Sequence, residues 1–144
     1  MKKSTRNIRY LVVHCSATPE GRDHTAKDIA LWHKQRGFNE IGYNYIVRLD
    51  GTVELGRDVN KIPAHVTNHN KDSIGICYIG GIDKNTLQPK DTRTPAQKEA
   101  LKKLLTDLKT LYPEAQILGH RDFPGVAKAC PCFNAKDEYK TISK

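Results

Sequence analysis

The chain has 144 residues, a length that fits one compact domain with a substantial core, and no apolar run approaches the roughly 20 residues that cross a bilayer. Its 24 Lys and Arg against 16 Asp and Glu give a formal net charge of +8, which favours polyanionic partners. The lysines are scattered and aromatic residues are few, so nucleic-acid binding is not expected as the main function.

The first third of the chain predicts a strand, a loop and a helix. The basic N-terminus runs into an apolar strand at residues 9–15, not into the apolar core of a secretory signal, which predicts synthesis in the cytoplasm without a signal peptide. A polar loop follows over residues 16–24. Thr25 is suited to cap a helix with Asp28 three positions later, and Gly37 is a typical residue just beyond a helix end.

The middle of the chain predicts a hairpin and a buried strand. Asp50-Gly51 separates two strand-like runs at 43–49 and 52–56, which is a strong hairpin signal. A loop rich in histidine and asparagine spans residues 64–71. The apolar run at 73–80 predicts an interior strand, and 83–93 predicts a polar insertion.

The last third begins with a complete helix start, in which Thr94 caps, Pro95 follows and Gln97 closes the capping box. Five leucines share one face of this helix: Leu101, Leu104, Leu105, Leu108 and Leu111. A short strand at 117–120, a loop at 124–133 and a terminal helix at 134–142 complete the pattern. Strands alternating with helices predict a single α/β domain over residues 1–144, with a central mixed sheet flanked by helices.

Two histidines, His14 and His120, stand at the ends of predicted strands, and a later loop holds Cys130 and Cys132. Imidazole nitrogen and thiolate are the ligands that zinc prefers, and catalytic zinc sites use three protein ligands. A histidine at a strand end is nevertheless more often a hydrogen-bonded boundary residue, and Cys-x-Cys is not the spacing of a zinc finger. Cys15 and Cys77 lie in apolar runs and are interpreted as buried small residues, with no disulfide framework. These residues alone leave a zinc site as one option.

Several motifs together resemble the type-2 N-acetylmuramoyl-L-alanine amidases, which include phage endolysins and the peptidoglycan recognition proteins. The resemblance runs from about Tyr10 to Phe133 and is nearest to the small phage endolysins. It is carried by Val13-His14-Cys15-Ser16-Ala17-Thr18, Gly42-Tyr43-Asn44-Tyr45, Asp50-Gly51-Thr52-Val53-Glu54, Asn70-Lys71-Asp72-Ser73-Ile74-Gly75-Ile76, Gly80-Gly81-Ile82-Asp83 and Lys128-Ala129-Cys130-Pro131.

The resemblance implies roles for six residues. One zinc ion per chain is expected on His14, His120 and Cys130, because Cys130 and not Cys132 falls in the Lys-Ala-Cys-Pro register. Tyr43 and Lys128 match two further catalytic positions, and His65 matches a position beside the substrate groove. Cys132 is interpreted as a packed or partly exposed thiol, and the alternative is that it takes the place of Cys130 as the ligand.

The implied reaction is hydrolysis of the amide between N-acetylmuramic acid and L-alanine in peptidoglycan. Zinc polarises a carbonyl and lowers the pKa of a water that it binds to about 7. Lys128 could stabilise the oxyanion, and Tyr43 could orient water or relay a proton.

Two other classes of function stay open: a non-catalytic peptidoglycan-binding module and a regulatory protein that binds another macromolecule, such as a polymerase. Such binding modules typically lack the cysteine ligand, which this chain keeps. We expect a monomer that acts on the cell wall after release or delivery.

Overall fold

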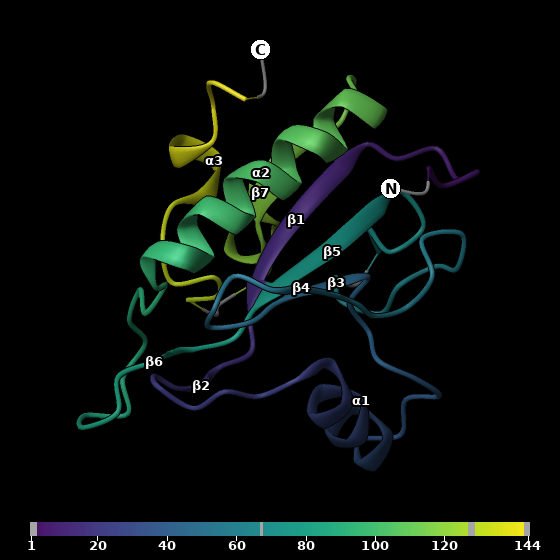
Figure 1. Ribbon diagram of the computed structural model, residues 1–144. Helices are drawn as coiled ribbons and strands as arrows, with labels where there is room; N and C mark the ends of the chain where they lie inside the picture. The colour runs from purple at the N-terminus through teal and green to yellow at the C-terminus, as the bar shows by residue number, and fades with distance from the viewer. Residues whose placement is uncertain (1–2, 67, 127–128, 143–144) are drawn as a thin grey trace.

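The computed structural model describes residues 3–66, 68–126 and 129–142. A five-stranded sheet forms the centre, with the strand order β4-β3-β5-β1-β7 (Figure 1). Its strands are β1 (Tyr10–Cys15), β3 (Tyr45–Val47), β4 (Val53–Leu55), β5 (Ser73–Tyr78) and β7 (Gln116–Gly119). Only the β3–β4 pair is antiparallel among these neighbours, so the predicted mixed sheet is confirmed.

The hairpin forms where Asp50-Gly51 predicts it, although both strands are shorter than the runs 43–49 and 52–56. Gly51 has a φ of +87°, a conformation that glycine adopts without steric cost. The structure also has a second, two-stranded sheet that was not predicted, formed by β2 (Thr18–Pro19) and β6 (Gly81–Ile82). Two-residue strands are too short to show a period in the sequence.

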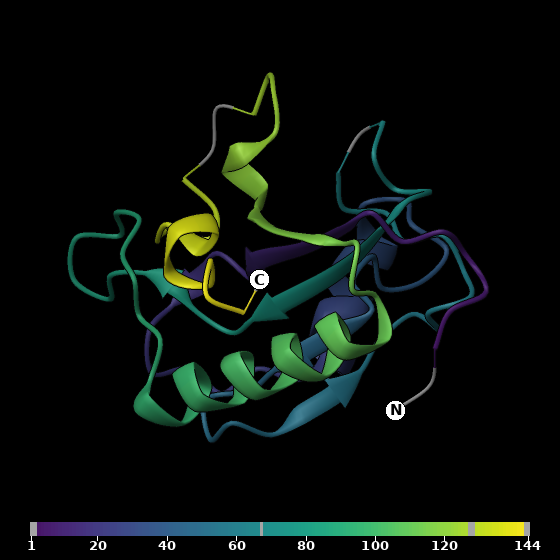
Figure 2. The same cartoon turned by 90° about the horizontal axis from the view of Figure 1, so that it is seen from above.

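The two long helices begin at the predicted caps. Thr25 and Asp28 form a capping box at the start of α1 (Ala26–Gln35), and Thr94 and Gln97 do so for α2 (Pro95–Leu111). Figure 2 shows α2 along one face of the sheet, with the turn directly after β7 on the other side. None of the described helices is long and apolar enough to cross a membrane.

The sheet has apolar regions on both of its faces because side chains alternate between the faces. The larger region joins the leucines of α2 to Leu11, Val13, Ile74 and Ile76. On the other face, Ile29 of α1 packs with Ile46, Cys77 and Ile79. Cys15 and Cys77 are both buried, as the sequence predicts. The face opposite α2 also receives His14, and it carries the candidate site.

The C-terminal helix α3 (Ala135–Glu138) is much shorter than the predicted 134–142. After α3 the backbone forms a tighter turn, because the Ile142 N–H donates to the carbonyl of Tyr139, three residues back. This turn directs both Tyr139 and Ile142 into the core beside α2. Tertiary packing therefore overrides the helical pattern here.

A buried arginine ties this C-terminal segment to the polar insertion. Arg93 has a side chain that is only 2% exposed, and it forms paired ion contacts with Asp91 and Glu138. Its guanidinium also donates to the Tyr139 hydroxyl at 3.0 Å and lies 3.4 Å from the ring centroid of Phe133. The insertion that the sequence indicates as polar thus contains a buried charge, and one of its two carboxylate partners, Glu138, lies 45 residues further along the chain.

Candidate metal and catalytic site

Strand register places two histidines side by side. Val13 of β1 is paired with Gly119 of β7 in a parallel ladder, so the next residues, His14 and His120, follow at the same level. Their ring centroids lie 4.5 Å apart. His14 is 1% exposed at the penultimate position of its strand.

His120 lies just beyond a strand, not at the end of one as predicted. β7 ends at Gly119, and His120 begins the turn η1 (His120–Asp122). The Asp122 carboxylate accepts a hydrogen bond from the Gly119 N–H at 2.8 Å, which bends the chain at this point. Asp122 thereby caps the turn.

Cys130 reaches the histidines from the loop after η1. Its sulfur accepts a hydrogen bond from the Cys15 N–H at 3.2 Å, and the buried Tyr78 hydroxyl donates to the Pro131 carbonyl at 2.6 Å. A Cβ at Gly119 would lie 2.7 Å from Pro131 Cδ, so only glycine lets this loop pack so closely on the sheet. Ligand atoms of His14, His120 and Cys130 all lie within 4.8 Å of one another.

This donor set fits a zinc ion. Tetrahedral zinc with usual Zn–N and Zn–S lengths holds a nitrogen and a sulfur ligand roughly 3.6 Å apart. The distance from His14 Nδ1 to Cys130 Sγ is 3.8 Å. Three protein ligands leave a fourth position for a reactant, as in catalytic zinc sites.

Cys132 takes a different place. Its sulfur lies 3.8 Å from Cys15 Sγ and 3.3 Å from the Gly81 carbonyl oxygen. The contact with the Cys15 thiol, together with burial, raises the pKa of Cys132, which disfavours the thiolate that a metal needs. Among the described residues it is Cys130 that joins the histidines, in agreement with the predicted register.

Tyr43 lies against the same cluster, with its ring centroid 4.9 Å from that of His14. The next residue, Asn44, is 1% exposed and accepts the Gly75 N–H of β5 at 3.0 Å, which fixes this segment to the sheet. On the other side, the Gly42 N–H donates to His33 Nδ1 at 2.8 Å. Burial raises the pKa of the Tyr43 phenol, so its hydroxyl keeps its proton and can act as a donor.

His65 lies behind His14 in the structure. Its Nδ1 lies 2.7 Å from His14 Nε2, and its Nε2 lies 2.7 Å from Ser73 Oγ. Burial lowers the pKa of His65 to about 3, so the ring is neutral. The substrate contact expected for His65 stays a prediction. The predicted catalytic residue Lys128 lies outside the described residues.

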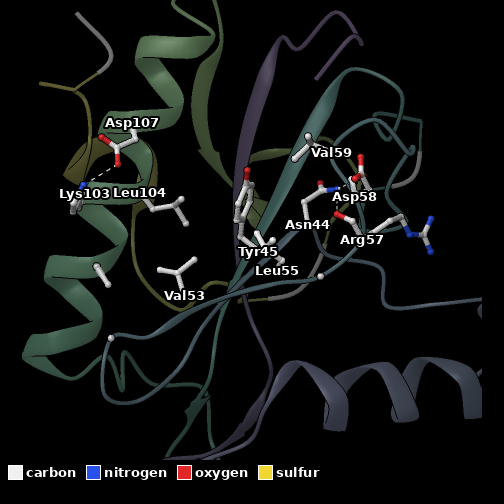
Figure 3. A pocket seen from close by; sticks show the side chains of 13 residues that line it. Asn44, Tyr45, Val53, Leu55, Arg57, Asp58, Val59, Lys103, Leu104 and Asp107 are labelled. Carbon is white, nitrogen blue, oxygen red and sulfur yellow. Dashed lines mark hydrogen bonds and ion pairs between the residues drawn. The ribbon is translucent and has the colours of Figure 1, made fainter. Parts of the chain in front are cut away.

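The structure also contains a cavity of about 530 Å³ between α2 and the β3–β4 hairpin (Figure 3). It is lined by Tyr45, Val53, Leu55 and Leu104, with charged residues such as Arg57, Asp58, Lys103 and Asp107. None of the predicted zinc ligands lines this cavity, and His14 lies on the opposite face of the sheet. The metal cluster therefore does not belong to it.

The chain is similar to known proteins in sequence and in fold. The family model described as N-acetylmuramoyl-L-alanine amidase matches residues 4–133. The chain is similar to an endolysin of Klebsiella phage KP32, with 44% identity over 126 residues that cover 88% of this chain and 82% of the relative.

Two solved structures share the fold. The amidase LysCS from Clostridium intestinale URNW is 28% identical with a TM-score of 0.77, and the match covers 98% of this chain and 87% of that one. Drosophila PGRP-LB is 27% identical with a TM-score of 0.75, covering 97% and 84%. The chain therefore belongs to the N-acetylmuramoyl-L-alanine amidase family and is an enzyme of that activity.

Proposed function

We propose that this amidase binds one zinc ion on His14, His120 and Cys130 and uses it to cleave peptidoglycan between N-acetylmuramic acid and L-alanine. The observation that carries the proposal is the convergence of two imidazoles and one thiol within 4.8 Å, in a chain of the amidase family. The similarity to phage endolysins supports the cell wall as the place of action. The net charge of +8 favours adhesion to an anionic wall.

The residues of the site have separate tasks in this reaction. A zinc ion supplies Lewis acidity and makes water nucleophilic at neutral pH. Tyr43 keeps its phenolic proton and packs against His14, and it is proposed to orient water or to pass a proton toward the leaving amine. Lys128 is proposed to stabilise the oxyanion by its charge. The products are a lactyl carboxylate on the sugar and a stem peptide with a free N-terminal L-alanine.

Other features of the function are also proposals. A non-catalytic binding module is disfavoured because the cysteine lies with both histidines, where it completes a ligand set. A regulatory protein partner and a monomeric state remain predictions. Pull-down from a host extract tests the partner, and sedimentation tests the oligomeric state.

The direct test is turnover of purified peptidoglycan, with released stem peptides identified by mass spectrometry. We expect peptides that begin with L-alanine, lost after chelation and restored by zinc. Cys130→Ser should abolish zinc binding and release. Cys132→Ser is the matched control, because it removes a thiol from the same loop but not from the metal cluster.

Two results would contradict the proposal. Zinc-loaded protein that binds the wall without releasing peptide would identify a binding module. Equal loss of zinc in Cys130→Ser and Cys132→Ser would show that the loop, not the Cys130 sulfur, determines metal binding.

A further inference from the structure

We propose that His65 and Ser73 form a hydrogen-bond chain that fixes the tautomer of His14 and so presents its Nδ1 to the metal. This inference rests on the zinc site proposed above and gives His65 a task that does not involve the substrate. His65 is a positioning residue in this account, since it acts through His14.

The direction of the hydrogen-bond chain follows from Ser73, the residue at its far end from His14. Ser73 is 0% exposed, and its hydroxyl lies 2.6 Å from the His69 carbonyl oxygen, which can only accept a hydrogen bond. The single proton of the hydroxyl therefore goes to His69. As a result, Ser73 Oγ must accept the hydrogen bond from His65 Nε2, 2.7 Å away.

The same reasoning then determines the tautomer of both rings. A neutral imidazole with its proton on Nε2 has a lone pair on Nδ1. His65 Nδ1 accordingly accepts from His14 Nε2 at 2.7 Å, so His14 carries its proton on Nε2. The lone pair of His14 is then on Nδ1, the atom that lies 3.8 Å from Cys130 Sγ.

The surroundings hold His65 in this place. The Asn70 side-chain oxygen accepts the N–H groups of His65 and Val66, both at 2.9 Å. Arg6 Nη1 donates to the carbonyls of residues 70, 71 and 73, which fixes the loop to the start of β5.

Gly75 leaves room for the ring beneath the sheet. A Cβ at this position would lie 2.9 Å from His65 Nδ1. The ring is therefore constrained by the loop, by Ser73 and by β5 itself, as is expected of a group that orients a ligand.

The test compares zinc affinity, by competition with a chromophoric chelator, in five proteins. Wild type is set against His65→Ala, His65→Asn and Ser73→Ala. Ser4→Ala serves as the matched control, because Ser4 is also buried and donates to a backbone carbonyl away from the site.

Loss of a group that orients a metal-bound histidine typically lowers metal affinity 10- to 100-fold. We expect a loss of about this size in His65→Ala and a smaller loss in Ser73→Ala. His65→Asn should retain most of the affinity because an amide oxygen can accept the His14 proton.

The tautomer itself is read by long-range ¹⁵N–¹H correlation spectra of the metal-free protein. We expect a proton on His14 Nε2 in wild type and a mixture of tautomers in His65→Ala. This measurement tests the hydrogen-bond chain in the absence of zinc. A wild-type protein that showed the expected tautomer but bound no zinc would refute the proposed metal site and not the hydrogen-bond chain.

Two results would overturn the inference. One is a His14 proton on Nδ1 in the wild-type protein. The other is a His65→Ala variant with the zinc affinity and tautomer of Ser4→Ala and only a raised KM, which would make His65 a substrate contact.

Discussion

Replacing Gly75 by alanine gives a prediction whose sign depends on one distance. Gly75 lies inside β5 and has no left-handed backbone conformation, so alanine should normally stabilise the protein by about 0.4–1 kcal/mol through the unfolded state. The added Cβ would, however, lie 2.9 Å from His65 Nδ1 and 3.1 Å from Cγ. Overpacking of this kind costs about 1–3 kcal/mol. We expect a net loss of roughly 0.5–2 kcal/mol.

The assay is a double-mutant cycle measured by urea unfolding of the metal-free protein. In a His65→Ala background the ring is gone, so Gly75→Ala should change from destabilising to neutral or stabilising. The coupling free energy should then be about 1–3 kcal/mol, the size of the removed overlap. An equal effect of Gly75→Ala in both backgrounds would refute the reasoning, because the cost would not come from the His65 ring.

Three further changes test other parts of the structure. Arg93→Met should lower the free energy of unfolding, measured with urea, by about 2–3 kcal/mol. This is less than for a fully buried ion pair, because the carboxylate partners of Arg93 are partly exposed. Lys103→Met removes an exposed ion pair and should cost under about 0.5 kcal/mol in the same assay. Burial lowers the pKa of His33, so this side chain binds a proton less readily in the folded protein than in the unfolded chain. The free energy of unfolding should therefore fall as the pH decreases below about 6.5. That loss should be smaller in His33→Asn, whose amide can still accept the Gly42 N–H, and an unchanged pH profile would contradict this account. Tyr43→Phe should lower peptide release by about 10²–10⁴-fold with zinc content unchanged, as measured by mass spectrometry and metal analysis.

The parts of the fold that local chemistry determines could be predicted from the sequence. Thr25 and Thr94 cap their helices through residues three positions away, and Gly51 takes the positive φ of a hairpin turn. The order of the strands and the short β2–β6 sheet could not be predicted in this way. They depend on pairing between segments far apart in the chain, which leaves no period in the sequence.

The candidate site shows the same division. Residue type and family register predict a ligand set of His14, His120 and Cys130, and the structure brings these residues together. The placement of His65 could not be found, because a loop rich in histidine and asparagine is typical of a polar surface. The position of His65 depends on two partners that only the folded sheet supplies. One is Ser73 at the start of β5, and the other is His14 of β1, 51 residues away in the sequence.

The three proposed ligands differ in how firmly the fold holds them. His14 is inside a central strand and His120 directly follows its parallel neighbour, so their separation is determined by sheet register. Cys130 lies on a loop and depends on individual contacts, such as the Cys15 N–H and the Tyr78 hydroxyl that binds the next residue. Because the sheet determines two ligands and a loop supplies the third, changes in the packing of the loop should affect metal affinity before they affect the fold.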